Sequence, residues 1–425
     1  MSKIYALALV LVTLTFFIMP QSIKASADSW VTKAPMPAGA GGIAVALNGK
    51  IYVIGRSSTY VYNPSIETWI SKTPMPTPQS GCAIAAYENK IYIFGGYNGT
   101  AAKNGVWIAT GETQMYDIST GMWSIKAPMP TPRGNLQAEV VNHKIYLISG
   151  IGTVDDGYAD PDFTNVTEAY DPSNDTWTTL ASIPTPVYYY ASAVVDNKIY
   201  IESGASGMYG FVNLNQIYDP ATNAWASGKP LPNPVTKAAA GATVGALAPA
   251  RLYVVGGTNN GRDGINANQI YDPQMDEWTF GAPMPTSRLG LALAVVSDTL
   301  YALGGVTDIS PPSHVGAVYT VNEQYFPLGY GEIVPSPSPS PTPSATPSIS
   351  PSLSPSPSPT LSQTTGPSNS PTPSFLPQPT QSPISASPPD LPIEHIAFAV
   401  AIVAITATSV AIIIKKRGSK EKKTP

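Results

Sequence analysis

Histidine is scarce in this sequence, and that scarcity restricts the chemistry that the chain can support. The three histidines, His143, His314 and His395, are far apart and form no motif. A serine-type catalytic triad therefore lacks a plausible base. The single cysteine, Cys82, has no partner for an intrachain disulfide and lies in the small-residue run GCAIAA, which favours a buried structural thiol.

Two carboxylates and two arginines are the candidates for acid–base or anion-binding chemistry. Glu139 and Glu202 stand within apolar runs, AEVV and IYIES. A carboxylate in an apolar position costs stability unless it is paired, and such groups cluster at functional sites. Arg133 and Arg288 precede two apolar runs at matching positions, where a guanidinium could hold a carboxylate through two hydrogen bonds. The alternatives are two separate, satisfied carboxylates and two ordinary surface arginines.

Aromatic side chains in the variable segments are candidates for ligand binding. They are Trp107, Tyr158, Tyr188, Tyr189 and Tyr209. Rigid aromatic residues serve as anchors for sugars and protein partners. The alternative is that they pack their own loops, because long loops need small cores.

Two further patterns suggest an ion site and modification sites. One loop is crowded with acidic residues, Asp155, Asp156, Asp160 and Asp162. Calcium prefers such oxygen ligands, but the spacing matches no EF-hand, so a solvated acidic loop is the alternative. Apart from calcium, the sequence suggests no cofactor. Asn-x-Ser/Thr motifs, which are glycosylation candidates, begin at Asn98, Asn165 and Asn174.

A repeat sets the positions of all these side chains. Its tryptophans are separated by 39 to 54 residues and are Trp30, Trp69, Trp123, Trp177, Trp225 and Trp278. Each unit carries an aromatic–aliphatic run that ends in a glycine signal, such as IYIFGG or LYVVGG. The first five units have a tyrosine seven residues before the next tryptophan, and proline-rich exits that cannot continue a central strand follow the tryptophans. The pattern predicts six units of four short strands.

These units resemble kelch repeats, whose marks are the paired glycine, the Tyr-Asp-Pro turn and the tryptophan at fixed spacing. The resemblance extends from Ser29 to about Pro327 and implies an all-β, six-bladed β-propeller. The last unit has no tryptophan. We therefore expect Trp30 to supply the outer strand of the sixth blade, which closes the ring and removes the free sheet edges.

Alignment of the blades shows that both carboxylates replace apolar residues. Glu139 takes an innermost-strand position held elsewhere by Val45, Ala85, Ala193, Ala246 and Ala294. Glu202 takes a position held by Ile54, Phe94, Ile148, Val255 and Leu303. By resemblance, the loops entering the innermost strands share one face with the links between second and third strands. Those links are long and varied here, so we expect ligand specificity on this irregular face.

Composition divides the rest of the chain into further segments. Residues 1–27 predict a signal peptide, with an apolar run followed by Ala25-Ser26-Ala27. Residues 335–392 hold 19 prolines and a single charge, Asp390, and predict a disordered Pro/Ser/Thr-rich stalk. Residues 393–414 predict one transmembrane helix, and the basic tail 415–425 is expected in the cytoplasm. The propeller, 28–334, is thus expected outside the cell, on a single-pass membrane anchor.

Charge and site chemistry together favour a binding protein. The propeller segment has 15 basic and 24 acidic residues, a balance of −9, which argues against a nucleic-acid partner. We expect a cell-surface binding or adhesion module that recognises an extracellular protein or glycan and is not an enzyme. One alternative is an exported sugar-modifying enzyme resembling kelch-type sialic acid mutarotases, with Glu139 or Glu202 as general acid/base and Arg133 or Arg288 holding a sugar carboxylate. The other is a structural protein of the cell envelope.

Overall fold

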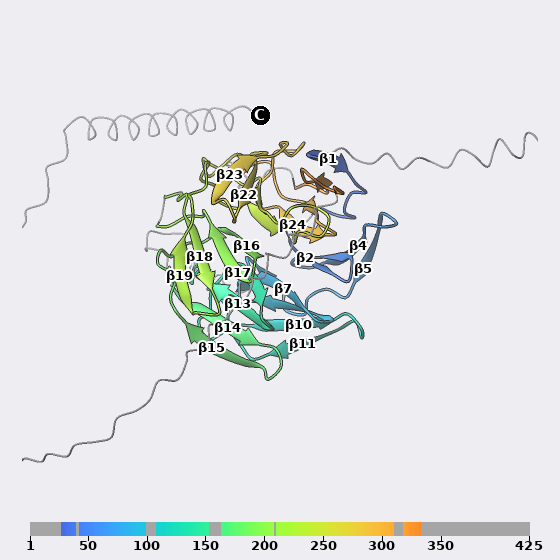
Figure 1. The fold of residues 1–425 in the computed structure, drawn as a ribbon. Helices are drawn as coiled ribbons and strands as arrows, with labels where there is room; N and C mark the ends of the chain where they lie inside the picture. Colours follow the sequence, from blue (N-terminus) through green and yellow to red (C-terminus); the bar gives the residue numbers. More distant parts are fainter. Residues whose placement is uncertain are drawn as a thin grey trace, which may run out of the picture. The chain divides into compact units, whose positions relative to one another are not determined.

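The computed structural model describes residues 27–39, 42–98, 108–152, 163–207, 210–309 and 318–332. These residues form six four-stranded sheets arranged as blades around a central axis, so the expected all-β, six-bladed propeller is confirmed (Figure 1). The stalk, the transmembrane helix, the basic tail and residues 1–26 of the signal peptide lie outside the described residues. Within the described ranges, no helix is long and apolar enough to cross a membrane.

The strands of each blade are antiparallel and follow one another outward from the axis. Blade 1 contains β2 (Ile43–Leu47), β3 (Lys50–Ile54), β4 (Thr59–Asn63) and β5 (Thr68–Lys72). Blade 2 contains β7 (Ala83–Tyr87), β8 (Lys90–Phe94), β10 (Thr113–Asp117) and β11 (Met122–Lys126). Blade 3 contains β12 (Ala138–Val141), β13 (Lys144–Ile148), β14 (Thr167–Asp171) and β15 (Thr176–Leu180).

The second half of the ring repeats this order. Blade 4 contains β16 (Ala191–Val195), β17 (Lys198–Glu202), β18 (Asn215–Asp219) and β19 (Ala224–Ser227). Blade 5 contains β20 (Ala239–Ala242), β21 (Leu252–Val255), β22 (Asn268–Asp272) and β23 (Glu277–Phe280). Blade 6 contains β24 (Ala292–Val296), β25 (Thr299–Leu303), β26 (Asn322–Phe326) and β1 (Ser29–Thr32). A small additional ribbon joins β6 (Gln79–Ser80) to β9 (Tyr97–Asn98).

The N-terminal strand closes the ring as expected. Strand β1 pairs with β26 in antiparallel register, with Trp30 opposite Tyr325. The sixth sheet is therefore built from both ends of the propeller segment, and blade 6 gains the tryptophan that its own unit lacks.

The repeated tryptophans join neighbouring blades. Each indole Nε1 donates a hydrogen bond of 2.8–3.0 Å to a backbone carbonyl in the proline-rich exit of the preceding blade. Each indole also packs on the tyrosine opposite it, with ring centroids 4.8–5.1 Å apart. A buried indole needs a partner for its N–H as well as an apolar contact surface, and this geometry supplies both.

Apolar side chains fill the spaces between blades, so the core is divided around the ring. One such cluster joins Tyr92 and Phe94 of blade 2 to Tyr170 of blade 3. Cys82 belongs to the cluster between blades 1 and 2 and is 7% exposed, which confirms the buried thiol. Burial raises the pKa of Cys82 to about 12, so the thiol stays protonated and unreactive at neutral pH.

Candidate functional site

A ring of residues in the left-handed backbone conformation surrounds the mouth of the central channel. Just before the innermost strand of blades 2 to 6 the chain places Gly81, Asn135, Tyr189, Lys237 and Gly290, with φ between 51° and 64°. We call these five residues the mouth ring. Each N–H donates to the carbonyl of the previous member, at 2.7 Å for Asn135 to Gly81, 3.0 Å for Tyr189, 2.9 Å for Lys237 and 2.8 Å for Gly290. The ring thus fixes five blades to one another at the channel mouth.

Three members of the mouth ring adopt the left-handed backbone conformation although they are not glycine. Left-handed backbone costs a residue with a Cβ about 1–2 kcal/mol, whereas glycine adopts it freely. Blades 2 and 6 use glycine, but blades 3, 4 and 5 use Asn135, Tyr189 and Lys237. Such strain gathers at functional sites. Fifteen other described non-glycine residues, most of them in turns between strands, also have positive φ, so what distinguishes these three is that they line one cavity.

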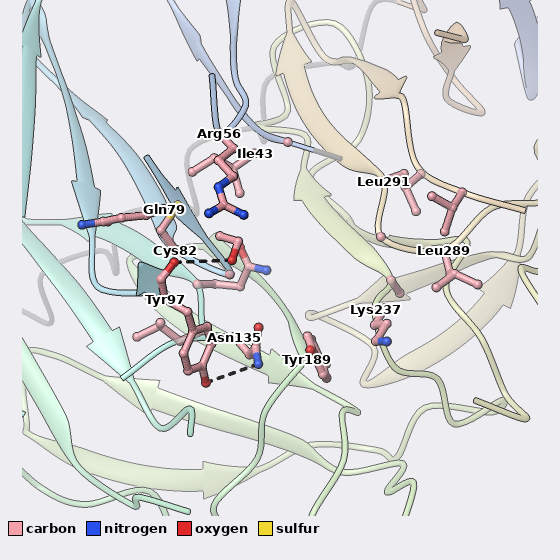
Figure 2. Close-up of a pocket in the computed structure, with 18 of the residues that line it drawn as sticks. Ile43, Arg56, Gln79, Cys82, Tyr97, Asn135, Tyr189, Lys237, Leu289 and Leu291 are labelled. Carbon is pink, nitrogen blue, oxygen red and sulfur yellow. Dashed lines mark hydrogen bonds between the residues drawn. The ribbon is translucent and has the colours of Figure 1, made fainter. Parts of the chain in front are cut away.

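The mouth ring surrounds a cavity of about 720 Å³ on the irregular face. All five members line it, together with Arg56 from blade 1 and Tyr97 from blade 2. In Figure 2, Arg56, Asn135, Tyr189 and Lys237 approach the opening from different sides. A concave site of this size with a few convergent polar groups is typical of a ligand-binding pocket.

Hydrogen bonds and ring contacts orient the polar side chains of the cavity. The Tyr97 hydroxyl donates to the Ile151 carbonyl at 3.0 Å, and Asn135 Nδ2 lies 3.5 Å from that hydroxyl. Lys237 Nζ lies 4.8 Å from the centroid of the Tyr189 ring, a cation–π distance. Burial lowers the pKa of Lys237 and raises that of Tyr189. The ammonium group is therefore partly stripped of water and would gain from an anionic partner.

Charge in the cavity has one sign. Among the described residues that line it, Arg56 and Lys237 are charged and none is a carboxylate. Neither cation forms an ion pair with a described residue. The mouth is therefore locally positive although the propeller as a whole is acidic.

Aliphatic side chains form another part of the wall. They come from blades 1 and 6 and are Ile43, Leu289, Leu291, Val306 and Ile309. We call these five residues the aliphatic arc. The cavity can therefore accept a ligand that combines an anionic group with an apolar one.

The aromatic candidates have different places in the structure. Tyr189 lines the cavity. Tyr188 instead packs on Phe163, with ring centroids 5.3 Å apart, and belongs to a small loop cluster with Tyr97 and Ile151. Trp107, Tyr158, Tyr209 and the four aspartates of the acidic loop lie outside the described residues.

The expectation that Arg133 and Arg288 are available to hold a ligand carboxylate is wrong. Both side chains are fully buried and pair within their own blades, Arg133 with Glu168 at 2.5 Å and Arg288 with Glu323 at 2.6 Å. Backbone carbonyls accept the remaining donors of Arg133, including those of Ser149 and Leu147. Arg288 is equally buried, although its Nε has no partner among the described residues, so neither guanidinium is accessible to a ligand.

Glu139 and Glu202 occupy separate places, and neither lines the cavity. Glu139 accepts a hydrogen bond of 2.5 Å from the Ser192 hydroxyl of blade 4, and burial raises its pKa to about 7. Glu202 is fully buried, its oxygens have no hydrogen-bond partner among the described residues, and burial raises its pKa well above the usual value. The register also corrects the alignment of blade 5, where Gly241, not Ala246, takes the position of Glu139.

The glycosylation candidates differ in accessibility. Asn174 lies exposed in the turn between β14 and β15, and its Oδ1 accepts a hydrogen bond of 2.6 Å from the Thr176 hydroxyl. Asn165 is exposed, but Thr167 of the same motif is fully buried. Asn98 ends β9, and the remainder of its motif lies outside the described residues. Within the described part of the chain, no group of three or more His, Cys, Asp or Glu is placed to hold a metal ion.

Sequence reasoning missed three residues of the cavity, Arg56, Asn135 and Lys237. A signal for the latter two was present: the position that is glycine before β7 and β24 is occupied by larger residues before β12, β16 and β20. Arg56 carries a weaker signal, since it replaces the second glycine of the pair in its own blade.

Two family models match the chain over the blades that build this site. Residues 80–130 match the model described as "Kelch motif", and residues 115–305 match "KLHDC2/KLHL20/DRC7 Kelch-repeats domain". Together the matches run from residue 80 to residue 305 and include all five mouth-ring positions.

Curated relatives share parts of the same sequence. The chain is 29% identical over 232 residues to "Kelch-like protein terF" of Aspergillus terreus, an alignment covering 53% of this chain and 50% of that protein. It is 27% identical over 150 residues to "Alpha-scruin" of Limulus polyphemus, covering 35% and 16%, and 24% identical over 237 residues to human "Kelch-like protein 15", covering 52% and 38%. The chain thus spans half the length of these relatives or less.

A solved structure shares the fold. "Structure of YjhT" superposes with a TM-score of 0.57 at 16% sequence identity, over 67% of this chain and 95% of that one. At this identity the likeness concerns the propeller architecture alone.

Proposed function

This chain belongs to the kelch-repeat β-propeller family, and from that premise we propose that it is a non-enzymatic binding module that captures its ligand at the mouth of the central channel. The observation that carries the proposal is the mouth ring. Asn135, Tyr189 and Lys237 hold a strained conformation in three successive blades and present their side chains to one cavity. Side chains that converge on one cavity from three blades, at a position where two other blades have glycine, are placed to contact a ligand.

We also propose that the propeller acts outside the cell. The support is in the sequence, which predicts a signal peptide at 1–27, a Pro/Ser/Thr-rich stalk at 335–392 and a transmembrane helix at 393–414 followed by a basic tail. A segment of this composition favours extended backbone, which suits a spacer between a membrane anchor and a domain that binds an extracellular protein or glycan.

Intact cells that express the full-length chain test both parts of the proposal. A displayed library of random peptides and a set of fluorescent glycans are applied from outside, and binding is compared with that to cells lacking the chain. We expect a binder whose affinity falls about tenfold or more in Tyr189→Gly and Lys237→Gly. Glycine relieves the left-handed strain, so the same variants should unfold at a Tm no lower than that of a matched surface variant.

Lys198→Gln is that matched control, because Lys198 is exposed at the start of β17, beside the short turn on the opposite face. It should retain full binding. A binder that is insensitive to both glycine variants would place the site elsewhere, and binding seen only in permeabilised cells would contradict display outside the cell.

The enzymatic alternative has less geometric support. A general acid/base must reach the substrate, but Glu139 is held by Ser192 and Glu202 is enclosed between blades, and neither lines the cavity. Sugar-ring isomerisation by the wild-type chain that disappears in Glu139→Gln would favour the enzyme over the binding module. A purely structural envelope role would instead require lattice-scale copy numbers per cell, which quantitative proteomics measures.

A further inference from the structure

We propose a second binding site, for a carboxylate group, at the junction between blades 1 and 2. The bound group takes the part that an aspartate of the chain plays in blades 3, 5 and 6. This site shares no lining residue with the cavity at the channel mouth. The inference therefore goes beyond the proposed function and does not depend on it.

A side-chain contact between neighbouring blades is repeated around the ring. In blade 3, Asp175 Oδ1 accepts a hydrogen bond from the Tyr170 hydroxyl at 2.6 Å and another from the Ala127 N–H of blade 2 at 2.8 Å. The equivalent residue accepts from the same two kinds of donor in blades 4, 5 and 6. In all six blades this position has left-handed backbone, with φ between 51° and 73°; its residues are Asp28, Glu67, Gly121, Asp175, Asn223 and Asp276.

Blade 2 has the two donors but not the acceptor, because Gly121 takes the aspartate position. Its donors are the Tyr116 hydroxyl and the Thr73 N–H of blade 1, where Trp123 Nε1 donates to the Thr73 carbonyl at 3.0 Å. No described residue accepts from either donor. A Cβ added at Gly121 would lie 3.6 Å from the Tyr116 hydroxyl, so this position has room for a side chain. The junction therefore offers two donors to an acceptor from outside the chain.

A pocket of about 220 Å³ at this junction adds positive charge to the two donors. Tyr116, which is 1% exposed, lines the pocket together with Lys72, the residue before Thr73. Lys50 and Tyr52 line it as well, and none of its described lining residues is a carboxylate. Neither lysine forms an ion pair with a described residue. A buried hydroxyl without an acceptor lowers stability, and two nearby cations favour an anionic acceptor.

The size of the pocket and the chemistry of the other blades identify the anion as a carboxylate. The same two donors hold an aspartate carboxylate in blades 3, 5 and 6. The pocket is smaller than the roughly 300 Å³ at which sites for drug-sized ligands begin, so it suits a small acid or the end of an acidic side chain.

The test follows thermal unfolding of the full-length chain by tryptophan fluorescence while sodium acetate replaces sodium chloride at constant ionic strength. We expect acetate to raise the Tm of the wild type in a saturable way. The rise should reach about 2–3 °C at roughly ten times the Kd. Hydrogen exchange should locate the effect, with slower exchange around Thr73 in acetate, because its N–H then has an acceptor.

Gly121→Asp supplies the carboxylate from within the chain. It should raise the Tm in chloride and abolish the response to acetate, because the new side chain occupies the place of the ligand. Gly121→Ala is its control: it adds only the Cβ, so the Tm should fall through left-handed strain while the response to acetate remains.

Two further variants test the donors without filling the site. Tyr116→Phe and Lys72→Gln should each weaken the apparent affinity for acetate about threefold or more. Lys126→Gln is the matched control, because Lys126 ends the outer strand of blade 2 as Lys72 ends that of blade 1. It should leave the response to acetate unchanged.

A blocked peptide with one glutamate and no free terminus distinguishes the two sources of the carboxylate. A response at lower concentration than acetate assigns the site to an acidic side chain of a partner protein, and a response at the same or higher concentration assigns it to a free acid. Either response should disappear in Gly121→Asp.

Equal responses to acetate in the wild type and Gly121→Asp would overturn the inference, and so would the absence of any response in the wild type. A response to sulfate that equals the response to acetate and disappears in Gly121→Asp would overturn the assignment to a carboxylate. None of these outcomes affects the proposed function, which Tyr189→Gly and Lys237→Gly test at a separate cavity.

Discussion

At Glu202 a group that ionises readily in water is enclosed in the protein core. Its equivalents in the other blades are apolar, as the pairing registers of β3, β8, β13, β21 and β25 show. Tyr200, two residues earlier on the same face of β17, belongs to the cluster that joins blades 4 and 5. The carboxyl is fully buried, and its oxygens have no hydrogen-bond partner among the described residues. Burial raises the pKa of Glu202 and favours its protonated form. Glu202 therefore lowers the stability of the propeller, and lowers it more as pH rises.

Replacement of Glu202 by isoleucine should stabilise the propeller, and more so at higher pH. The pKa of Glu202 is raised in the folded state, so folding favours the proton, and the wild type loses stability as pH rises above the ordinary carboxyl range. Glu202→Ile removes this loss and restores the residue type of Ile54 and Ile148, a gain of about 1–3 kcal/mol at neutral pH. Urea unfolding at pH 4.5 and 7.5 measures the gain in the free energy of unfolding and its dependence on pH.

Exposed Glu277 provides the control for that experiment. Glu277→Gln should leave the pH dependence unchanged, because its carboxyl is exposed on β23. Part of the pH dependence of stability should remain in every variant, because burial also raises the pKa of Glu139 to about 7. An unchanged difference between the two pH values in Glu202→Ile would contradict the assignment of a buried, protonated carboxyl.

At the scale of the blade, the buried polar residue of the third strand is satisfied in two ways, by an arginine or by the backbone. The third-strand position is Glu168 and Glu323 in blades 3 and 6, which also carry Arg133 and Arg288. In blades 2, 4 and 5 it is Gln114, Gln216 and Gln269, whose amides bond to the backbone of Thr77, Thr185 and Asn233. The residue in the arginine position of blades 4 and 5 is Val187 and Val235. The third-strand residue therefore changes together with its partner: glutamate occurs with arginine, and glutamine occurs in blades without that arginine.

A double-mutant cycle in blade 3 tests this pairing rule. Arg133→Val alone should cost about 3–5 kcal/mol, because it leaves Glu168 buried without a counter-charge. Adding Glu168→Gln recreates the solution of blades 4 and 5 and should recover most of that loss. Denaturant unfolding of the two single variants and the double variant gives the coupling energy. Additive losses would mean that the arginine and glutamate act independently.

The sequence predicted the elements better than the site. Tryptophans recur in the first five units and a glycine signal in all six, and they located the blades and the closing strand because each mark has a fixed structural role. Arg133 was misplaced because its partner, Glu168, is 35 residues away and is brought to it only by the strand register. Asn135 and Lys237 were missed because their left-handed conformation is indicated only by comparison with blades 2 and 6, where glycine takes the same position.

For the whole molecule, closure of the ring depends on a contact that the N-terminus supplies. In blades 3, 4 and 5 a residue two positions before the tryptophan, Asp175, Asn223 or Asp276, accepts from the blade's tyrosine and from a backbone N–H of the preceding blade. In blade 6 that residue is Asp28, which accepts from Tyr325 at 2.7 Å and from the Ala282 N–H at 2.6 Å. The predicted signal peptide ends just before it, so processing there would leave the closing residue intact.

Loss of the side-chain hydrogen-bond acceptor at Asp28 should weaken the closure of the ring at blade 6. Asp28→Ala removes two hydrogen bonds and should cost about 1–3 kcal/mol, whereas Asp28→Asn should be nearly neutral because Asn223 makes the same two contacts in blade 4. Hydrogen exchange locates the effect. In Asp28→Ala the amides of β1 and β26 should exchange faster than those of the other blades, because the strand supplied by the N-terminus can separate without unfolding the rest. Asp175→Ala loses the equivalent contacts inside a continuous blade and should leave β26 protected; equal exchange of β26 in both variants would show that closure does not depend on Asp28.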